Sequence, residues 1–330
     1  MGLISFTDRG LYCQQGDFYI DPWKPVRRAV ITHAHSDHAR YGSQYYFAHS
    51  DSFYLLKARL GQDIVLQTAG YDQSILINGV KISFHPAGHV IGSAQVRVEY
   101  KGEVWVVSGD YKIEPDNITV PFEPVKCHTF ITESTFGLPI YQWKPQAEIM
   151  RNIHDWVLAN RAKGRYSILS AYSLGKAQRL IYNLSAMGHK FYAHGAVYYM
   201  NLAVQQGMPS FPDVTYLRPE TPKDEVKDGI IIVPSADTGN PWLKRWAPHA
   251  FGICSGWMQV RGSQRRRNAD AGFALSDHAD WPGLIQAIRA TGAETVYVTH
   301  GSSAVLARYL KETYGLRTGV VQTAFGEEED

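Results

Sequence analysis

Three histidines and one carboxylate lie within six residues of each other, directly behind a hydrophobic run. The run 29–32 is mostly β-branched and predicts a buried strand, so His33 and His35, two residues apart at its end, would point to the same side. Asp37 and His38 follow just beyond. Imidazole nitrogens and carboxylate oxygens are usual ligands of zinc and related ions, and four on one short loop can serve two ions. The spacing H-x-H-x-D-H therefore indicates a binuclear metal site, with a histidine-rich surface turn as the alternative.

Two ions need more ligands than one loop supplies, and three other polar residues follow strand-like runs. His89 lies between glycines that let the backbone bend, Asp110 follows the apolar run 104–108, and His300 follows 295–298. A single histidine after a strand is more often a hydrogen-bonded structural residue. Four strand ends with matching chemistry reinforce one another, so these three residues are predicted to complete the site.

At this point the sequence resembles a known family, the metallo-β-lactamase-fold hydrolases, and within it the nucleic-acid-processing β-CASP branch. The loop from His33 to His38, with His89 and Asp110, resembles the motifs of the general fold family. Further segments resemble motifs of the branch and the entry to its inserted domain, namely 132–137 (TESTFG), 273–280 (FALSDHAD), 298–301 (VTHG) and 169–178 (LSAYSLGKAQ). The resemblance implies an α/β protein, a metallo-β-lactamase αββα sandwich with an inserted small β-CASP-type α/β domain.

The resemblance also implies how the metal ligands are shared. Two divalent ions are expected, with a water or hydroxide between them as the nucleophile. Histidine-rich ligation favours zinc, and manganese is the alternative for activity. One ion would be held by His33, His35, His89 and Asp110, and the other by Asp37, His38, Asp110 and His300.

Carried over in the same way, His278 would be the general acid that protonates the leaving oxygen, and Glu133 would hold its other ring nitrogen. Asp37 is counted with these two as catalytic. Asp21 matches the family's early aspartate, which supports the ligand loop. The alternative for Asp21 is a turn residue before Pro22, and for His278 a place in a helix-capping segment.

The composition is consistent with this assignment but does not establish it. A chain of 330 residues is long for one small core, by the prior of about 100 to 200 residues per domain. Its three cysteines form no close pair, which argues against a disulfide framework and fits a reducing compartment. The sequence offers no signal-like segment and no apolar run long enough to span a bilayer. We therefore expect a cytoplasmic protein with no membrane partner.

The ligand motifs come before about residue 137 and again after about 273, so the intervening segment must be inserted into the metal-binding domain. We expect domain segments at 1–140, 141–265 and 266–330, the middle one being the β-CASP-like insert. Strands alternate with helices there, which predicts a parallel sheet. The expected elements are a helix over 145–162, a strand over 166–170, a helix over 176–187, and strands over 190–193 and 229–234.

The net charge of +2 does not by itself indicate a nucleic-acid partner. A basic stretch over 261–268 precedes the proposed general acid, and arginines clustered beside a cleft could neutralise successive phosphates. The alternative is a solvated basic turn. We expect the substrate-binding residues to include Lys176, Arg265, Arg266 and Arg267.

Three functions compete. The first is DNA hydrolysis by a 5′ exonuclease of DNA repair, since the chain resembles small bacterial exonucleases associated with a DNA ligase and a helicase. The second is an RNA-processing nuclease, because contacts to the sugar cannot be identified from sequence. RNase J-like members carry a further C-terminal domain, and the sequence stops soon after the third motif, which favours DNA. The third is a small-molecule metallo-hydrolase or a silent scaffold, which would need neither Glu133 nor His278.

Overall fold

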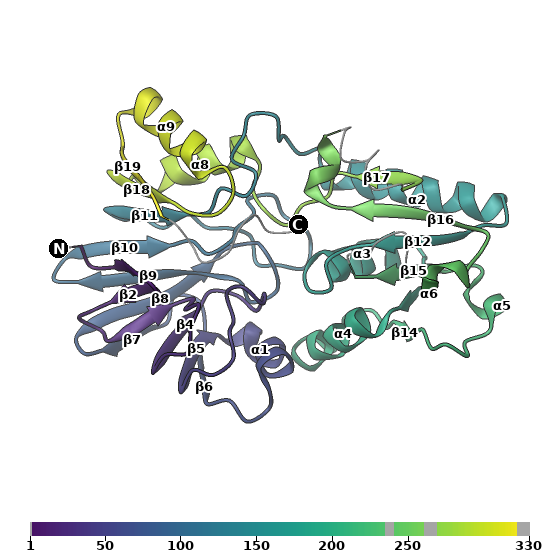
Figure 1. Ribbon diagram of the computed structural model, residues 1–330, viewed down its shortest axis with the longest axis horizontal. Helices are drawn as coiled ribbons and strands as arrows, with labels where there is room; N and C mark the ends of the chain where they lie inside the picture. Colours follow the sequence, from purple (N-terminus) through teal and green to yellow (C-terminus); the bar gives the residue numbers. More distant parts are fainter. Residues whose placement is uncertain (1, 235–240, 261–268, 322–330) are drawn as a thin grey trace. The chain divides into compact units, whose positions relative to one another are not determined.

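The computed structural model describes residues 2–234, 241–260 and 269–321 (Figure 1). The chain packs as two compact units. The first unit contains the residues up to 115, 119–142 and those from 278 onward, and the second contains 116–118 and 143–277. The sequence analysis expected three domain segments, 1–140, 141–265 and 266–330. That division remains a proposal. Among the described residues, no helix combines the length and the apolar character that crossing a bilayer requires.

The first unit contains a six-stranded sheet whose strands follow one another in chain order. Its first three strands are antiparallel neighbours, and β3 to β6 pair in parallel. The strands are β1 (Ser5–Thr7), β2 (Gly10–Cys13), β3 (Phe18–Ile20), β4 (Arg28–Ile31), β5 (Tyr45–His49) and β6 (Leu66–Ala69). Between β5 and β6 lie the short turn η1 (Ser50–Ser52) and the helix α1 (Phe53–Leu60).

A seven-stranded sheet with the order β19-β18-β11-β10-β9-β8-β7 forms the second layer of this unit. Strands β7 to β10 are antiparallel, whereas β10, β11, β18 and β19 are parallel neighbours. Their bounds are β7 (Ser74–Ile77), β8 (Val80–Pro86), β9 (Ala94–Tyr100), β10 (Glu103–Val107), β11 (Thr129–Thr132), β18 (Thr295–Val298) and β19 (Arg317–Val320).

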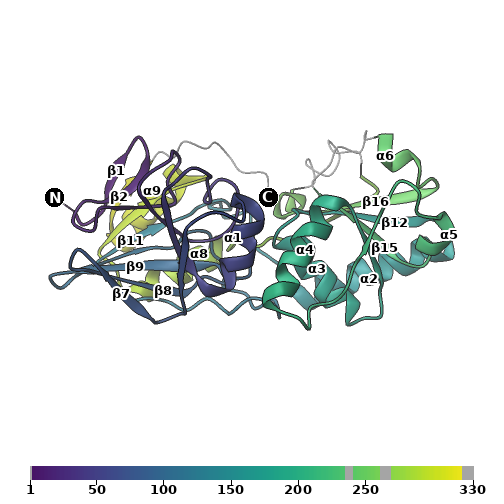
Figure 2. The same cartoon turned by 90° about the horizontal axis from the view of Figure 1, so that it is seen from below.

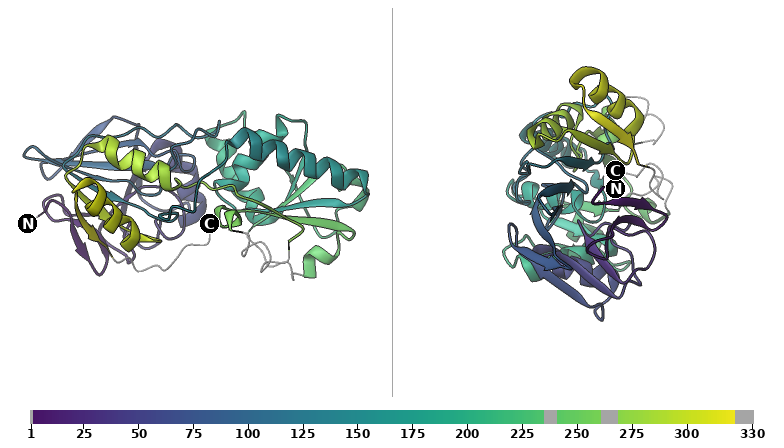
Figure 3. Two further views of the ribbon diagram at one scale, coloured as in Figure 1. Left: turned by 90° about the horizontal axis from the view of Figure 1, so that it is seen from above. Right: turned by 90° about the vertical axis from the view of Figure 1, so that its left-hand side faces the viewer.

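Alternating apolar residues bury one face of each sheet against the other. In β8, Val80, Ile82 and Phe84 face this core, and the Phe84 ring lies 4.8 Å from that of Phe47 in β5 (centroid to centroid). Burying each such side chain contributes about 1.5–3 kcal/mol. The helices α8 (Trp281–Thr291) and α9 (Ser303–Tyr314) pack on the opposite face of the seven-stranded sheet (Figure 3). The packed sheets and covering helices confirm the predicted α/β fold class.

The second unit is built on a six-stranded sheet with the order β14-β13-β15-β12-β16-β17, in which every neighbouring pair is parallel (Figure 2). Its strands are β12 (Tyr166–Ser170), β13 (Phe191–Ala193), β14 (Thr215–Tyr216), β15 (Ile230–Val233), β16 (His249–Cys254) and β17 (Ala271–Phe273). The helical segments are α2 (Gln146–Ala162), α3 (Lys176–Ser185), α4 (Gly195–Gly207), α5 (Lys223–Val226), α6 (Pro241–Lys244) and η2 (Gly256–Gln259).

Candidate metal centre

The predicted metal ligands come from the ends of strands in both sheets of the first unit. The loop that follows β4 carries His33 and His35, the turn between β8 and β9 carries His89, and Asp110 comes shortly after β10. His300 comes two residues after β18. Because β10, β11 and β18 are parallel neighbours, their carboxyl ends lie at one edge of the sheet. That topology places Asp110, Glu133 and His300 side by side.

The first ligand group consists of His33, His35, His89 and Asp110, whose ligand atoms all lie within 4.8 Å of one another. Nε2 of His33 is 3.5 Å from Oδ2 of Asp110, and Nε2 of His89 is 3.8 Å from the same oxygen. Nδ1 of His35 lies 3.1 Å from Nε2 of His89. All four residues are buried. Three imidazoles and one carboxylate are a donor set that suits a tetrahedral divalent ion.

The second ligand group consists of His38, Asp110 and His300, again within 4.8 Å. Nε2 of His38 is 3.3 Å from Oδ2 of Asp110, and Nδ1 of His300 is 3.8 Å from Oδ1 of Asp110. Asp37 adds a carboxylate oxygen 3.2 Å from Nε2 of His38. Asp110 belongs to both groups, so its carboxylate could contribute a ligand atom to each.

Several atoms of these groups have no hydrogen-bond partner within the described part of the chain, although they are buried. They are Nε2 of His33, Oδ2 of Asp37, both carboxylate oxygens of Asp110 and Nδ1 of His300. A buried polar atom without a partner costs about 1–3 kcal/mol, and more where it carries charge. Their convergence on one small region fits divalent metal ions. This cluster can bind metal.

Burial and neighbouring charges determine which histidines of the cluster are protonated. Burial, and then the neighbouring His38 charge, hold the pKa of His33 well below its usual value, which favours the neutral imidazole that metal binding requires. Burial also opposes charge on His38, but the Asp110, Asp37 and Asp21 carboxylates outweigh it and hold the pKa of His38 well above the usual value. A bound cation would take the place of that proton.

Asp21 holds the His38 ring by its other nitrogen. Its Oδ2 accepts a hydrogen bond from Nδ1 of His38 at 2.7 Å and one from the Thr32 hydroxyl at 2.6 Å. Its Oδ1 accepts from the backbone N–H of Thr32 at 2.8 Å. Asp21 therefore fixes the proton on Nδ1 and leaves Nε2 for a metal. Thr32 was not predicted from the sequence, and its position next to His33 is the signal that could have identified it.

Two glycines allow the backbone to turn next to the ligands. Gly109, which precedes Asp110, has a φ of 57°, and a Cβ there would lie 2.7 Å from the Thr32 side chain. Gly301, which follows His300, has a φ of 62°, and a Cβ there would lie 2.3 Å from the Ser134 carbonyl oxygen. Left-handed conformation and close packing together require glycine at both positions.

Glu133 and His278 form a buried pair beside the ligands. Nδ1 of His278 donates to the Glu133 carboxylate, 3.0 Å from Oε1 and 2.9 Å from Oε2. The His278 ring centroid lies 4.6 Å from that of His89. Donor atoms of Asp110, Glu133 and His278 also lie within 4.8 Å of one another, so a third metal-like grouping overlaps the first two. The structure thus brings together the two residues predicted as acid and orienting partner.

Known proteins resemble the chain over nearly its whole length in one case and over part of it in others. It is 28% identical over 328 residues to a protein of Opitutus terrae described as a probable DNA ligase, a match covering 98% of the chain and 31% of that protein. It is 32% identical over 148 residues to the endoribonuclease ysh-1 of Neurospora crassa, and 29% identical over 120 residues to YSH1 of Saccharomyces cerevisiae. These two matches cover 42% and 35% of the chain.

The chain is similar to these nucleases, and its fold and buried His/Asp cluster are consistent with the β-CASP branch of the metallo-β-lactamase fold. It spans 31% of the Opitutus protein and 15–17% of these YSH1 proteins. No protein-family model matches it. A crystal structure of a protein of unknown function from Enterococcus faecalis V583 shares the fold, with a TM-score of 0.61, 11% identity, and coverage of 92% of this chain and 80% of that one.

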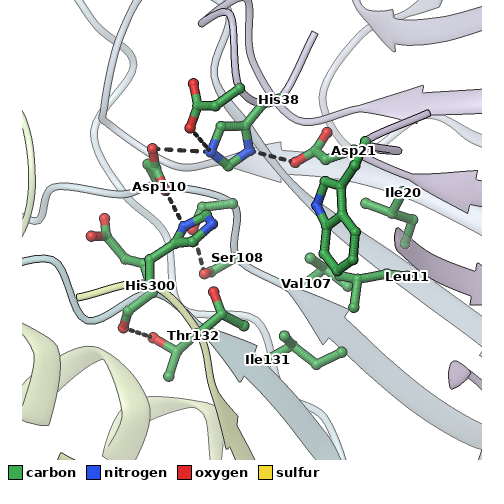
Figure 4. Close-up of a pocket in the computed structure, with 15 residues that line it drawn as sticks. Leu11, Ile20, Asp21, His38, Val107, Ser108, Asp110, Ile131, Thr132 and His300 are labelled. Atoms are coloured by element: carbon green, nitrogen blue, oxygen red, sulfur yellow. Dashed lines mark hydrogen bonds and ion pairs between the residues drawn. The ribbon is translucent and has the colours of Figure 1, made fainter. Parts of the chain in front are cut away.

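A cavity of about 40 Å³ borders the second ligand group (Figure 4). Its polar side includes Asp21, Asp37, His38, Asp110 and His300. Its apolar side is formed by Leu11, Ile20, Trp23, Val107 and Ile131. A space of this size has room for about three water-sized groups. It could hold an ion of the second group with its water, and not a nucleobase.

Of the four predicted substrate-binding residues, only Lys176 lies within the described part of the chain. Lys176 begins α3 in the second unit, is buried, and its charge lies near the Cys254 thiol. Its proposed contact with substrate therefore stays a prediction. The arginines at 265, 266 and 267 lie outside the described residues.

Proposed function

We propose that this chain is a metal-dependent phosphodiesterase of the β-CASP branch that hydrolyses DNA, acting as a 5′ exonuclease in repair. One observation carries the proposal: two ligand groups that share Asp110 lie directly beside the Glu133–His278 pair. Hydrolysis of a phosphodiester needs positive charge on the phosphate and a proton for the oxygen that leaves. The ligand groups could hold the positive charge, and the Glu133–His278 pair could supply the proton.

Bound divalent ions would neutralise phosphate charge and lower the pKa of a water molecule toward neutrality. We assign one ion to His33, His35, His89 and Asp110 and the other to Asp37, His38, Asp110 and His300. The histidine-rich donor set favours zinc, and manganese is the alternative, because affinity order alone does not determine which metal a site holds.

His278 is the proposed proton donor. Since the Glu133 carboxylate accepts from Nδ1 of His278, the proton available for transfer is on Nε2 of the imidazolium form. Attack of the water molecule on phosphorus breaks the bond from phosphorus to a sugar oxygen. That oxygen takes the proton from Nε2 of His278. Glu133 stabilises the imidazolium before transfer and keeps the ring in place afterwards.

DNA is the preferred substrate because the match to the probable DNA ligase extends over 98% of the chain. RNA is the second candidate, supported by matches to endoribonucleases over about a third to two fifths of it. A functional link to a DNA ligase and a helicase is part of the proposal. Lys176 and Arg265 to Arg267 are proposed as contacts to the substrate backbone.

The test is cleavage of single-stranded DNA and RNA of matched sequence, labelled at either end, with zinc or manganese. The control is Asp110→Asn, which removes the shared negative charge with little change of shape. Mononucleotides released from the DNA 5′ end would support the proposal. Preferential cleavage of RNA would favour the second candidate. Metal-dependent hydrolysis of a lactam or thioester without cleavage of either nucleic acid would overturn both.

A further inference from the structure

Each of the three hydrogen-bonding groups of Tyr111 connects to the Glu133–His278 pair, either directly or through a neighbouring residue. Its backbone N–H donates to Oε1 of Glu133 at 2.7 Å, and its carbonyl accepts the N–H of Ala279, next to His278, at 2.7 Å. Its hydroxyl lies 3.0 Å from Oγ1 of Thr132, which in turn donates to the Glu133 carbonyl at 3.0 Å. One residue therefore contacts the carboxylate and the segment that carries the imidazole, and it reaches the Glu133 backbone through Thr132.

Packing fixes Tyr111 in place. The side chain is fully buried, with its ring stacked on that of Phe122 at 5.2 Å and 6.4 Å from that of Phe130, between centroids. Since Thr132 Oγ1 already donates to Glu133, the Tyr111 hydroxyl is the donor between these two residues.

Tyr111 also directly follows Asp110, the carboxylate that both ligand groups share. The next residue, Lys112, holds the loop of His89: its N–H donates to the Ala87 carbonyl at 3.0 Å, and its ammonium donates to the Gly88 carbonyl at 2.8 Å. Three consecutive residues thus join the ligands to the proposed acid. Adjacent Cα atoms are about 3.8 Å apart, which leaves little room for the two parts to shift independently.

We propose that Tyr111 is a positioning residue that holds the Glu133–His278 pair at a fixed place relative to the Asp110 carboxylate. The proposal rests on the phosphodiesterase function proposed above. Tyr111 touches neither substrate nor metal in this account. Its effect is on the proton donor, because a misplacement of about 1 Å can cost about a hundredfold in rate. A residue that only fills the core would affect every reaction of the site equally.

The experiment compares Tyr111→Phe with the wild type in the full, metal-loaded chain. Two substrates are used: a DNA oligonucleotide, whose leaving oxygen needs a proton, and the p-nitrophenyl ester of thymidine 5′-phosphate, whose phenolate does not. Loss of one buried hydrogen bond should lower kcat on the oligonucleotide by about tenfold with KM unchanged. Turnover of the ester should change less than twofold, and metal content should be the same.

Two further variants serve as controls. Thr132→Val removes the same hydroxyl contact from the other side together with the bond to the Glu133 carbonyl, so the double variant should lose no more activity than Thr132→Val alone. Tyr192→Phe removes a buried hydroxyl in the second unit, 2.5 Å from the Glu225 carbonyl, and should leave both substrates unaffected. Equal losses of activity on both substrates, or no loss on either, would overturn the proposed role of Tyr111 but not the proposed function. A wild type that cleaves neither substrate would overturn the proposed function and this role together.

Discussion

His38 and His278 each donate Nδ1–H to a buried carboxylate. Nε2 of His38 lies within 3.3 Å of oxygens of Asp37 and Asp110, which suits a metal ligand. The His278 ring packs near Phe136, at 6.1 Å between centroids. Glu133 is already engaged by His278 and by a backbone N–H, so it is poorly placed to ligate. The same pairing is compatible with both proposed roles, a metal ligand for His38 and a proton donor for His278.

The substitution His278→Ala should leave both metals bound and remove most turnover. A positioned general acid contributes about a hundred- to ten-thousandfold, and kcat on an oligonucleotide should fall by that factor. The measurement is metal content by elemental analysis together with single-turnover cleavage. A variant that loses one equivalent of metal would instead assign His278 to the overlapping group with Asp110 and Glu133.

Asp21→Asn should weaken metal binding while leaving the fold intact. An amide cannot accept the bonds from His38, the Thr32 hydroxyl and the Thr32 N–H together, so the imidazole loses its fixed orientation. Loss of such a supporting partner typically costs about 10- to 100-fold in metal affinity. Competition with a chromogenic chelator measures it. Asp17→Asn, at a surface ion pair with Arg28, is the control, and equal weakening in both variants would contradict the role of Asp21.

At the scale of elements, sequence patterns predicted strands and helices best where flanking signals were clear. The strand predicted over 166–170 is β12, and the helix predicted over 145–162 is α2, which begins after Pro145 and buries Ile149, Ile153 and Val157 at a spacing of four. Proline at a helix start and a regular apolar period leave little choice of structure.

Helix α4 was not predicted. In the helix Val197 is buried while Tyr199 is 58% exposed. His194 caps the helix by accepting from the Ala196 N–H, and histidine is not among the usual N-cap residues. Aromatic and β-branched residues also lower helix propensity, so packing in the second unit decides this element.

The ligands could be predicted because their types and spacing occur in short stretches of sequence. The contacts of Tyr111 could not, because its N–H meets the Glu133 side chain 22 residues away and its carbonyl meets Ala279. Backbone groups carry no sequence signature. Only the pairing of β10, β11 and β18 brings these segments to one edge.

Gly109→Ala should destabilise the first unit and reduce its metal content. The new methyl group would lie 2.7 Å from Thr32, and the φ of 57° is strained for any L-residue. Gly315→Ala is the matched control, since Gly315 has a φ of 67° with nothing within 4 Å of the added Cβ. Thermal unfolding should show a cost of about 1–2 kcal/mol for Gly315→Ala and a clearly larger one for Gly109→Ala. Equal costs would mean that the turn tolerates the methyl group.

At the scale of the whole molecule, every proposed ligand and the acid pair belong to the first unit, although they come from segments between residues 33 and 300. The second unit, mostly residues 143–277, interrupts this sequence. Bound metal would therefore connect chain segments that are far apart in sequence but lie at one edge of one fold. Metal binding is then coupled to the stability of the first unit, because the unfolded chain has no preformed site.

Removal of metal should loosen the first unit and leave the second unchanged. A metal at a hundred times its Kd stabilises the folded state by about 2.7 kcal/mol, and this is lost when a chelator removes it. Hydrogen exchange followed by mass spectrometry, with and without chelator, should show faster exchange in peptides covering β4, β10 and β18. Peptides from β12, β15 and β16, the central strands of the other sheet, are the internal control. Equal acceleration in both sets would contradict a metal site confined to the first unit, and no acceleration would contradict the metal site itself.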